Sequence, residues 1–334
     1  MNAKRTLAAV AAGTALLLSG CGQTQPVVEN PSVTLEQAVY SMEDYETIYR
    51  FFQSQIDSQL PSMGMTVEGL LAEEGGKDAY HGLISGNAMQ QLLLTGTLEN
   101  LMKEEKMVLD EKALEAKLTE NRDLMGGEEG MENALAELHM TEDQFSRLLV
   151  SPEIMIGQLK ERYGKDEEAL ETFYQENFYR AKHVLINEAE GGTEKQAQAQ
   201  EIAQQARDGA DFDELVKEFG QDPGMAANPE GYTFGKGEMV QEFYEGTKAL
   251  EEGGISDPVR TSYGWHVIQR LPLNALEGGT RDKVLETYLA DKIDGWIASH
   301  EPVVSDEAKA LTFETLPSLE TPETKEEPGD QAEQ

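Results

Sequence analysis

The stretch Thr261–Leu271, TSYGWHVIQRL, is a largely apolar run with the titratable ring of His266 in its middle. We predict two strands around it, joined by a turn at residues 262–264, with His266 on the second and buried strand. Histidine is intermediate in its preference for burial, so a lone histidine in such a strand is usually a core residue with one satisfied hydrogen bond. A functional role for His266 therefore needs support from elsewhere in the chain.

Residues 177–272 combine strand patterns at both ends with helical patterns between them. Ala181–Ile186, AKHVLI, is strand-like, and Asp211 with Glu214 has the spacing of a helix N-terminal cap. A glycine-punctuated segment, EGYTFGKGEMV, and a further helix, VQEFYEGTKAL, precede the closing strands. We expect an α+β domain here, with a small antiparallel-rich sheet and surrounding helices.

Residues 35–176 show helical periodicity and no clear strand pattern. Apolar residues recur every four positions before Pro61: Ile48, Phe52, Ile56 and Leu60. Thr141 and Gln144 have the spacing of a capping box, so a helix should begin near Glu142, and Pro152 can break it into two pieces. The methionines of this segment fit either plain core packing or a surface that adapts to varied clients.

Helical character returns in residues 273–313, which we expect to pack on the domain formed by residues 35–176. That domain is then discontinuous, with the α+β domain inserted in it. Residues 314–334 are acidic and almost free of apolar side chains, so we predict a disordered tail.

Residues 1–20 have the pattern of a secretory signal, with Lys4 and Arg5 before an apolar run too short to span a membrane as a mature helix. The segment from Leu18 to Cys21, LSGC, resembles the bacterial lipobox. This resemblance implies cleavage before Cys21 and attachment of lipid to its thiol. Cys21 is the only cysteine, and residues 21–34 are expected to form the lipid anchor and a polar tether.

The chain is strongly acidic. Its 334 residues include 63 acidic and 27 basic side chains, for a formal net charge of -36. Such a charge repels nucleic acid backbones and anionic lipid headgroups, and it favours basic partners. The length allows roughly two domains of ~100 to 200 residues.

The order of landmarks from residue 181 to 271 resembles the parvulin family of peptidyl-prolyl isomerases. AKHVLI, FGQDPG, FGKGEMVQEF and GGISDPVRTSYGWHVIQRL follow one another as that family's segments do. The resemblance implies a catalytic group made of His183, Asp222, Thr261 and His266. It implies substrate contacts for Met239, Phe243 and Tyr232, with Met239 and Phe243 as the apolar floor under the proline ring.

The reaction implied by this resemblance is rotation about the Xaa-Pro bond, whose partial double-bond character creates a barrier of ~18 to 20 kcal/mol. An apolar pocket can lower that barrier by disfavouring the polar planar amide. We expect His183 and His266 to be a hydrogen-bonded pair that positions Asp222 and Thr261 without transferring protons. No cofactor is implied, and no third ligand at a suitable spacing supports a metal site.

The helical segments on either side resemble the PrsA/SurA family of foldase and chaperone lipoproteins. This resemblance implies a membrane-anchored extracytoplasmic foldase whose partners are unfolded or newly exported polypeptides, and it leaves homodimerisation open. The alternative is a non-catalytic holdase with a degenerate parvulin module, because Gly231 stands where that family often has leucine and YEGTKAL replaces a more apolar helix end. A solute-binding lipoprotein would need two α/β lobes, which residues 35–176 do not supply.

Overall fold

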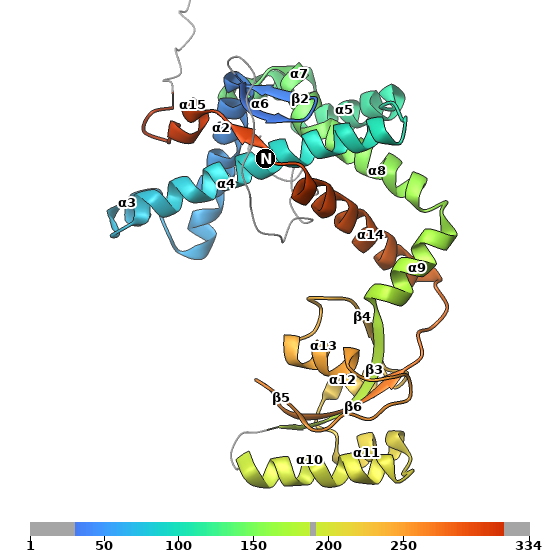
Figure 1. Cartoon of the computed structure of the whole chain (residues 1–334). Helices are drawn as coiled ribbons and strands as arrows, with labels where there is room; N and C mark the ends of the chain where they lie inside the picture. The colour runs from blue at the N-terminus through green and yellow to red at the C-terminus, as the bar shows by residue number, and fades with distance from the viewer. Residues whose placement is uncertain (1–30, 188–191, 317–334) are drawn as a thin grey trace, which may run out of the picture. The chain divides into compact units, whose positions relative to one another are not determined.

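The computed structural model describes residues 31–187 and 192–316, which form two compact units (Figure 1). Of the described residues, 31–161 and 289–316 belong to the first unit, and the second lies within Arg162–Tyr288. One unit is thus inserted in the other, as the sequence predicted. The predicted signal, Cys21, most of the tether and most of the acidic tail lie outside the described residues.

The first unit is mostly helical. Its elements are α2 (Met42–Gln59), the 3-10 helix η1 (Leu60–Met63), α3 (Val67–Ala72), α4 (Gly76–Glu104), α5 (Glu111–Met125), α6 (Glu128–Leu138), α7 (Glu142–Phe145), the π-helix η2 (Ser146–Val150), most of α8 (Ser151–Tyr163), the end of α14 (Gly278–Ser299) and α15 (Asp306–Ala310). Helices α2 and α4 pack together, with Ile48 and Leu92 fully buried. Of the predicted apolar positions along α2, Phe52 and Ile56 are only half-buried.

A small sheet in the first unit corrects the prediction that residues 31–34 are a tether and that no strands occur nearby. Strands β1 (Pro31–Leu35), β2 (Ala38–Ser41) and β7 (Val303–Val304) pair antiparallel in the order β2-β1-β7. Val33 and Leu35 are buried in this sheet. The strands are very short, and β7 comes from the distant C-terminal segment, so local sequence patterns give no sign of the pairing.

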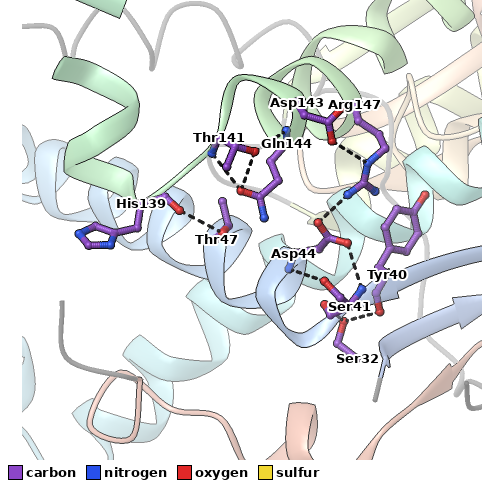
Figure 2. Close-up of polar contacts among 10 residues, drawn as sticks. All are labelled: Ser32, Tyr40, Ser41, Asp44, Thr47, His139, Thr141, Asp143, Gln144 and Arg147. Carbon is purple, nitrogen blue, oxygen red and sulfur yellow. Dashed lines mark hydrogen bonds and ion pairs between the residues drawn. The ribbon is translucent and has the colours of Figure 1, made fainter. Parts of the chain in front are cut away.

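The predicted capping box at Thr141 is present, and α7 begins at Glu142 (Figure 2). The helix is not broken at Pro152. Instead, the wider turn of the π-helix η2 lies directly before α8. This turn lets the helix continue past Pro152, which has no backbone N–H to donate.

An ion pair joins η2 to the start of α2. Ser41 caps α2 reciprocally with Asp44, whose other oxygen, Oδ1, lies 2.6 Å from the guanidinium of Arg147 (Figure 2). The side chain of Asp44 is only 8% exposed, so its charge is compensated inside the unit by Arg147 and by the backbone N–H of Ser41.

The second unit is the α+β domain. Its elements are α9 (Glu167–Asn177), β3 (Tyr179–Asn187), α10 (Gly192–Arg207), α11 (Phe212–Phe219), α12 (Pro223–Ala227), β4 (Tyr232–Phe234), α13 (Gln241–Lys248), β5 (Val259–Thr261), β6 (Gly264–Leu271) and the first part of α14. The strands form one antiparallel sheet in the order β4-β3-β6-β5. The predicted α+β fold is therefore confirmed.

The two faces of this sheet carry different helices (Figure 1). Val184, Ile186 and Val267 pack toward α10 and α11. Ala181 and Ile268 pack on the other face, which α13 covers. This alternation follows the two-residue period of a strand and leaves one face of β3 and β6 directed at α13.

The limits of this unit are wider than the predicted 177–272. Tyr174 and Phe178 form a small core cluster with Val284 of α14. The unit therefore includes α9 and the beginning of α14, which the sequence pattern assigned to the helical domain. Within residues 31–187 and 192–316, no helix combines the length and apolar character needed to cross a membrane.

Candidate active site

Strands β3 and β6 bring the two predicted histidines together. Their register pairs His183 with Ile268 and Leu185 with His266, which places both imidazoles on the face covered by α13. The ring centroids lie 5.0 Å apart at an angle of 64°. Both residues are buried.

Phe243 of α13 contacts both rings edge to face. Its centroid lies 5.1 Å from that of His183 and 5.4 Å from that of His266. Phe243 is itself buried, and its position as an aromatic neighbour of both rings limits their rotation. The predicted floor residue and the histidine pair therefore belong to one packed group.

Asp222 lies beside His183 as the N-terminal cap of α12. Its Oδ1 accepts a hydrogen bond from the backbone N–H of Gly224 at 2.8 Å, and its Oδ2 accepts one from the hydroxyl of Tyr232 at 3.0 Å. His183 Nε2 is 3.2 Å from Oδ2, without the alignment of a hydrogen bond. Burial, followed by the bond to Asp222, raises the pKa of Tyr232 to about 12, so this hydroxyl remains a donor at neutral pH.

Thr261 lies behind His266 at the end of β5. Its Oγ1 is 2.8 Å from His266 Nε2 and accepts a hydrogen bond from the backbone N–H of Tyr263 at 3.1 Å. The hydroxyl hydrogen can then be donated to Nε2, provided that the imidazole is neutral. Thr261 is buried and does not line the pocket described below.

Both histidines are neutral at physiological pH. Burial lowers the pKa of His183 to about 4, against the opposing effect of the Asp222 charge. Burial, and then the neighbouring His183, lower the pKa of His266 to about 4 as well. A charged ring in this position would lose its hydration, and at His183 this loss outweighs the attraction of the Asp222 carboxylate.

The expected hydrogen bond within the histidine pair is not formed. The rings meet by an edge contact, and both nitrogens of His183 and Nδ1 of His266 have no hydrogen-bond partner among the described residues. The reason is geometric, because the two side chains come from diagonal rather than directly paired positions of β3 and β6.

A pocket of about 390 Å³ opens beside these residues. Six of the seven predicted site residues of this domain line it: His183, Asp222, Tyr232, Met239, Phe243 and His266. The pocket is also lined by four residues that were not predicted from the sequence: Leu185, Glu238, Val240 and Tyr263. Leu185 could have been found from its place two residues after His183, on the same strand face.

Gly231 has a left-handed backbone conformation and lies close to β3. Its φ is +90°, and a Cβ there would lie 2.8 Å from the carbonyl oxygen of Ala181. Glycine is therefore required by the backbone and its close approach to β3. The neighbouring Tyr232 supplies a large side chain to the pocket instead.

The pocket offers no strong nucleophile, and no cluster of three or more His, Cys, Asp or Glu that could hold a metal occurs in the part of the chain that the structure describes. It offers apolar and aromatic walls, two neutral imidazoles and the oriented carboxylate of Asp222, with Glu238 as a second carboxylate. This set suits the binding and twisting of an amide.

Residues 183–271 match the family model of the PPIC-type PPIASE domain, named Rotamase. The chain therefore contains a parvulin-type peptidyl-prolyl isomerase domain, and the resemblance found in the residue pattern is confirmed. The matched residues run from the histidine of β3 to the end of β6.

The chain is also similar to foldases and chaperones. It is 38% identical to the foldase protein PrsA of Geobacillus kaustophilus over 31% of this chain and 35% of that protein. It is 34% identical to the chaperone SurA of Burkholderia thailandensis over 31% of this chain and 23% of that protein. A crystal structure of PrsA from Bacillus anthracis aligns with 18% identity and a TM-score of 0.36, covering 63% of this chain and 96% of that chain. The chain thus matches about a third or less of the length of these two curated relatives.

Proposed function

We propose that this chain is a foldase that catalyses cis–trans isomerisation of Xaa-Pro bonds in unfolded polypeptides. The observation that carries the proposal is the pocket beside the histidine pair, in which Met239 and Phe243 are joined by the oriented carboxylate of Asp222. The match of residues 183–271 to the isomerase family supports the same reaction.

The proposed mechanism lowers the rotation barrier without making or breaking a bond. In the planar amide the carbonyl oxygen carries partial negative charge and the nitrogen partial positive charge, and twisting reduces both. Water stabilises the planar form, so removal of water by the walls of the pocket favours the twisted form in relative terms. A carboxylate beside the carbonyl oxygen acts in the same direction, because it repels the charge of the planar form.

Each side chain has a distinct part in this mechanism. Met239 and Phe243 hold the proline ring, while Asp222 faces the moving carbonyl. Thr261 and His266 are positioning residues. Thr261 holds His266 through its hydroxyl, and His266 packs against the ring of His183, which lies beside Asp222. Neutral imidazoles suit this role, because a positive ring would stabilise the planar carbonyl.

The experiment that tests this function is the refolding of a client protein whose slow phase is limited by one Xaa-Pro bond. Catalytic amounts of the chain should accelerate that phase, and Asp222→Ala should reduce the acceleration while leaving the domain folded. An unchanged slow phase with the wild-type chain would contradict the proposal.

The second candidate is a holdase that binds unfolded chains without isomerising them. It is favoured by large apolar side chains exposed on the first unit, namely Met63 at 67%, Leu83 at 52% and Val108 at 83%. Suppression of client aggregation that survives His183→Ala and His266→Ala, with no isomerisation by the parent chain, would establish it. Gly231 does not distinguish the two candidates, because its φ of +90° and its close approach to Ala181 require glycine whichever function the pocket has.

We further propose that the protein works outside the cytoplasm, attached to the bacterial cell membrane through lipid on Cys21. The pattern of residues 1–21 supports this, and newly exported polypeptides would then be its clients. Mass spectrometry of the membrane fraction should find acylated Cys21, and Cys21→Ala should release the protein from that fraction. Light scattering of the purified chain tests whether it forms a homodimer.

A further inference from the structure

Glu238 lies on the rim of the isomerase pocket, directly before Met239 in the chain. Its Oε2 accepts a hydrogen bond from the backbone N–H of Gly235 at 2.7 Å and lies 2.6 Å from Nζ of Lys283. Both contacts engage Oε2, and the side chain of Glu238 is 39% exposed. A cationic ligand in the pocket can therefore approach the other oxygen.

Lys283 comes from α14, beyond the residues that match the isomerase family, but it belongs to the same compact unit. Its Nζ also donates to the carbonyl of Thr233 at 3.1 Å and lies 5.7 Å from the ring centroid of Phe178. These contacts hold its charge beside Glu238. The helix that follows the matched domain thus modifies the charge of the pocket rim.

The charged groups that line the pocket are all acidic. Asp222 and Glu238 are carboxylates, while His183 and His266 are neutral because burial lowers the pKa of each to about 4. The described residues that line the pocket include no lysine or arginine. Such a pocket attracts a cation beside the bound proline and repels a phosphate or carboxylate there.

We propose that Glu238 makes the pocket select peptides with lysine or arginine adjacent to the proline, and that Lys283 limits this selection by partly neutralising Glu238. The proposal rests on the proposed function in that it takes this pocket as the proline-binding site. It adds the class of sequence that the site prefers and a residue outside the matched domain that adjusts the preference.

The test is a set of NMR titrations of the full chain with matched peptides that carry lysine, alanine or glutamate beside one proline. The wild-type chain should bind the lysine peptide about three-fold more tightly than the alanine peptide, the factor expected from one partly exposed ion pair, and the glutamate peptide more weakly. The ratio should fall toward one at high salt.

Three variants separate the two residues. Glu238→Gln keeps an acceptor for Gly235 and should bring the lysine-to-alanine affinity ratio close to one. Lys283→Gln should raise the ratio by about a further three-fold. The double variant should behave like Glu238→Gln, because Lys283 acts only through Glu238.

A ratio that stays unchanged in Glu238→Gln would overturn the proposal, as would a lower ratio in Lys283→Gln. If Lys283→Gln weakens all peptides equally, Lys283 is merely structural and the proposal also fails. Isomerisation is measured on the same samples by exchange spectroscopy. Selective binding without acceleration would contradict the proposed function but not this inference. Acceleration without selectivity would contradict this inference but not the proposed function.

Discussion

The burial of two neutral histidines predicts that the second unit loses stability as the pH falls. Burial lowers the pKa of His266 to about 4 in the folded state, whereas an unfolded histidine has a pKa of about 6.5. Between these values the unfolded chain binds a proton that the folded chain does not. The stabilising contribution is therefore present above pH 6.5 and is lost progressively as the pH falls toward 4.

The magnitude follows from the same two pKa values. One pKa unit corresponds to about 1.4 kcal/mol of unfolding free energy. Lowering the pH from 7 to 5 removes roughly half of the full contribution that the pKa shift makes to stability. A single histidine of this kind should therefore cost about 2 kcal/mol of unfolding free energy over that interval. His266→Gln cannot titrate, yet it retains an acceptor for the hydroxyl of Thr261, so its stability should depend less on pH.

Urea unfolding at pH 7, 6 and 5 measures this effect. Trp265 lies in the second unit and Trp296 in the first, so Trp296→Phe provides a background in which fluorescence reports the second unit alone. The drop in unfolding free energy from pH 7 to 5 should be smaller by about 2 kcal/mol in His266→Gln than in the parent. His300→Gln, in the first unit, should leave the drop unchanged.

Comparing a variant with its parent cancels the contribution of the many carboxylates, which titrate in both. Equal drops in the parent and in His266→Gln would refute the reasoning. They would mean that His266 keeps an ordinary pKa in the folded chain and is not desolvated as its position implies.

Three further predictions concern the same domain. Isomerisation of a neutral peptide should not depend on pH between about 5.5 and 8, because both histidines stay neutral; an activity midpoint near 6.5 in exchange spectroscopy would argue against this. Thr261→Val should lower the unfolding free energy by about 1 to 3 kcal/mol in urea titrations, since it leaves a buried nitrogen of His266 without its partner, whereas Thr261→Ser should retain most of the stability. Gly231→Ala should lower the unfolding free energy by about 1 to 3 kcal/mol in thermal and urea unfolding. Gly237→Ala should lower it less, because Gly237 also has a positive φ but has open space around it. Equal losses of unfolding free energy would contradict the clash with β3.

Much of the candidate site could be predicted from the sequence because the landmarks of the domain occur in a fixed order. That order assigned His183, His266 and Asp222 to one place. The antiparallel pairing of β3 with β6 brings the two histidines together, and Asp222 lies beside His183 at the start of α12. The edge contact between the imidazoles could not be predicted. It depends on the diagonal register of β3 and β6, and the residue pattern of neither strand alone reveals that register.

Glu238 and Lys283 illustrate a second limit. Neither residue stands out in the sequence, since one is a single acid in an acidic chain and the other lies in a helix outside the domain pattern. Their 2.6 Å ion pair arises only from the packing of α14 within the second unit. The same long-range packing explains why the unit begins before residue 177.

The strands of the first unit were missed for a related reason. Val33 and Thr34 of β1 pair with the distant Val304 and Val303, and the two residues of β7 have no periodicity to detect. Local signals such as the Thr141 capping box were predicted correctly because the residues involved are three positions apart.

Exchange NMR of a short unphosphorylated peptide tests most directly whether the pocket isomerises Xaa-Pro bonds. With catalytic amounts of the full chain, cis–trans exchange should become far faster than the uncatalysed process, which takes tens to hundreds of seconds. His266→Ala and Asp222→Ala should lose most of this acceleration while keeping folded spectra. If a well-folded wild-type chain leaves the exchange rate of every Xaa-Pro peptide unchanged, the pocket is not an isomerase site.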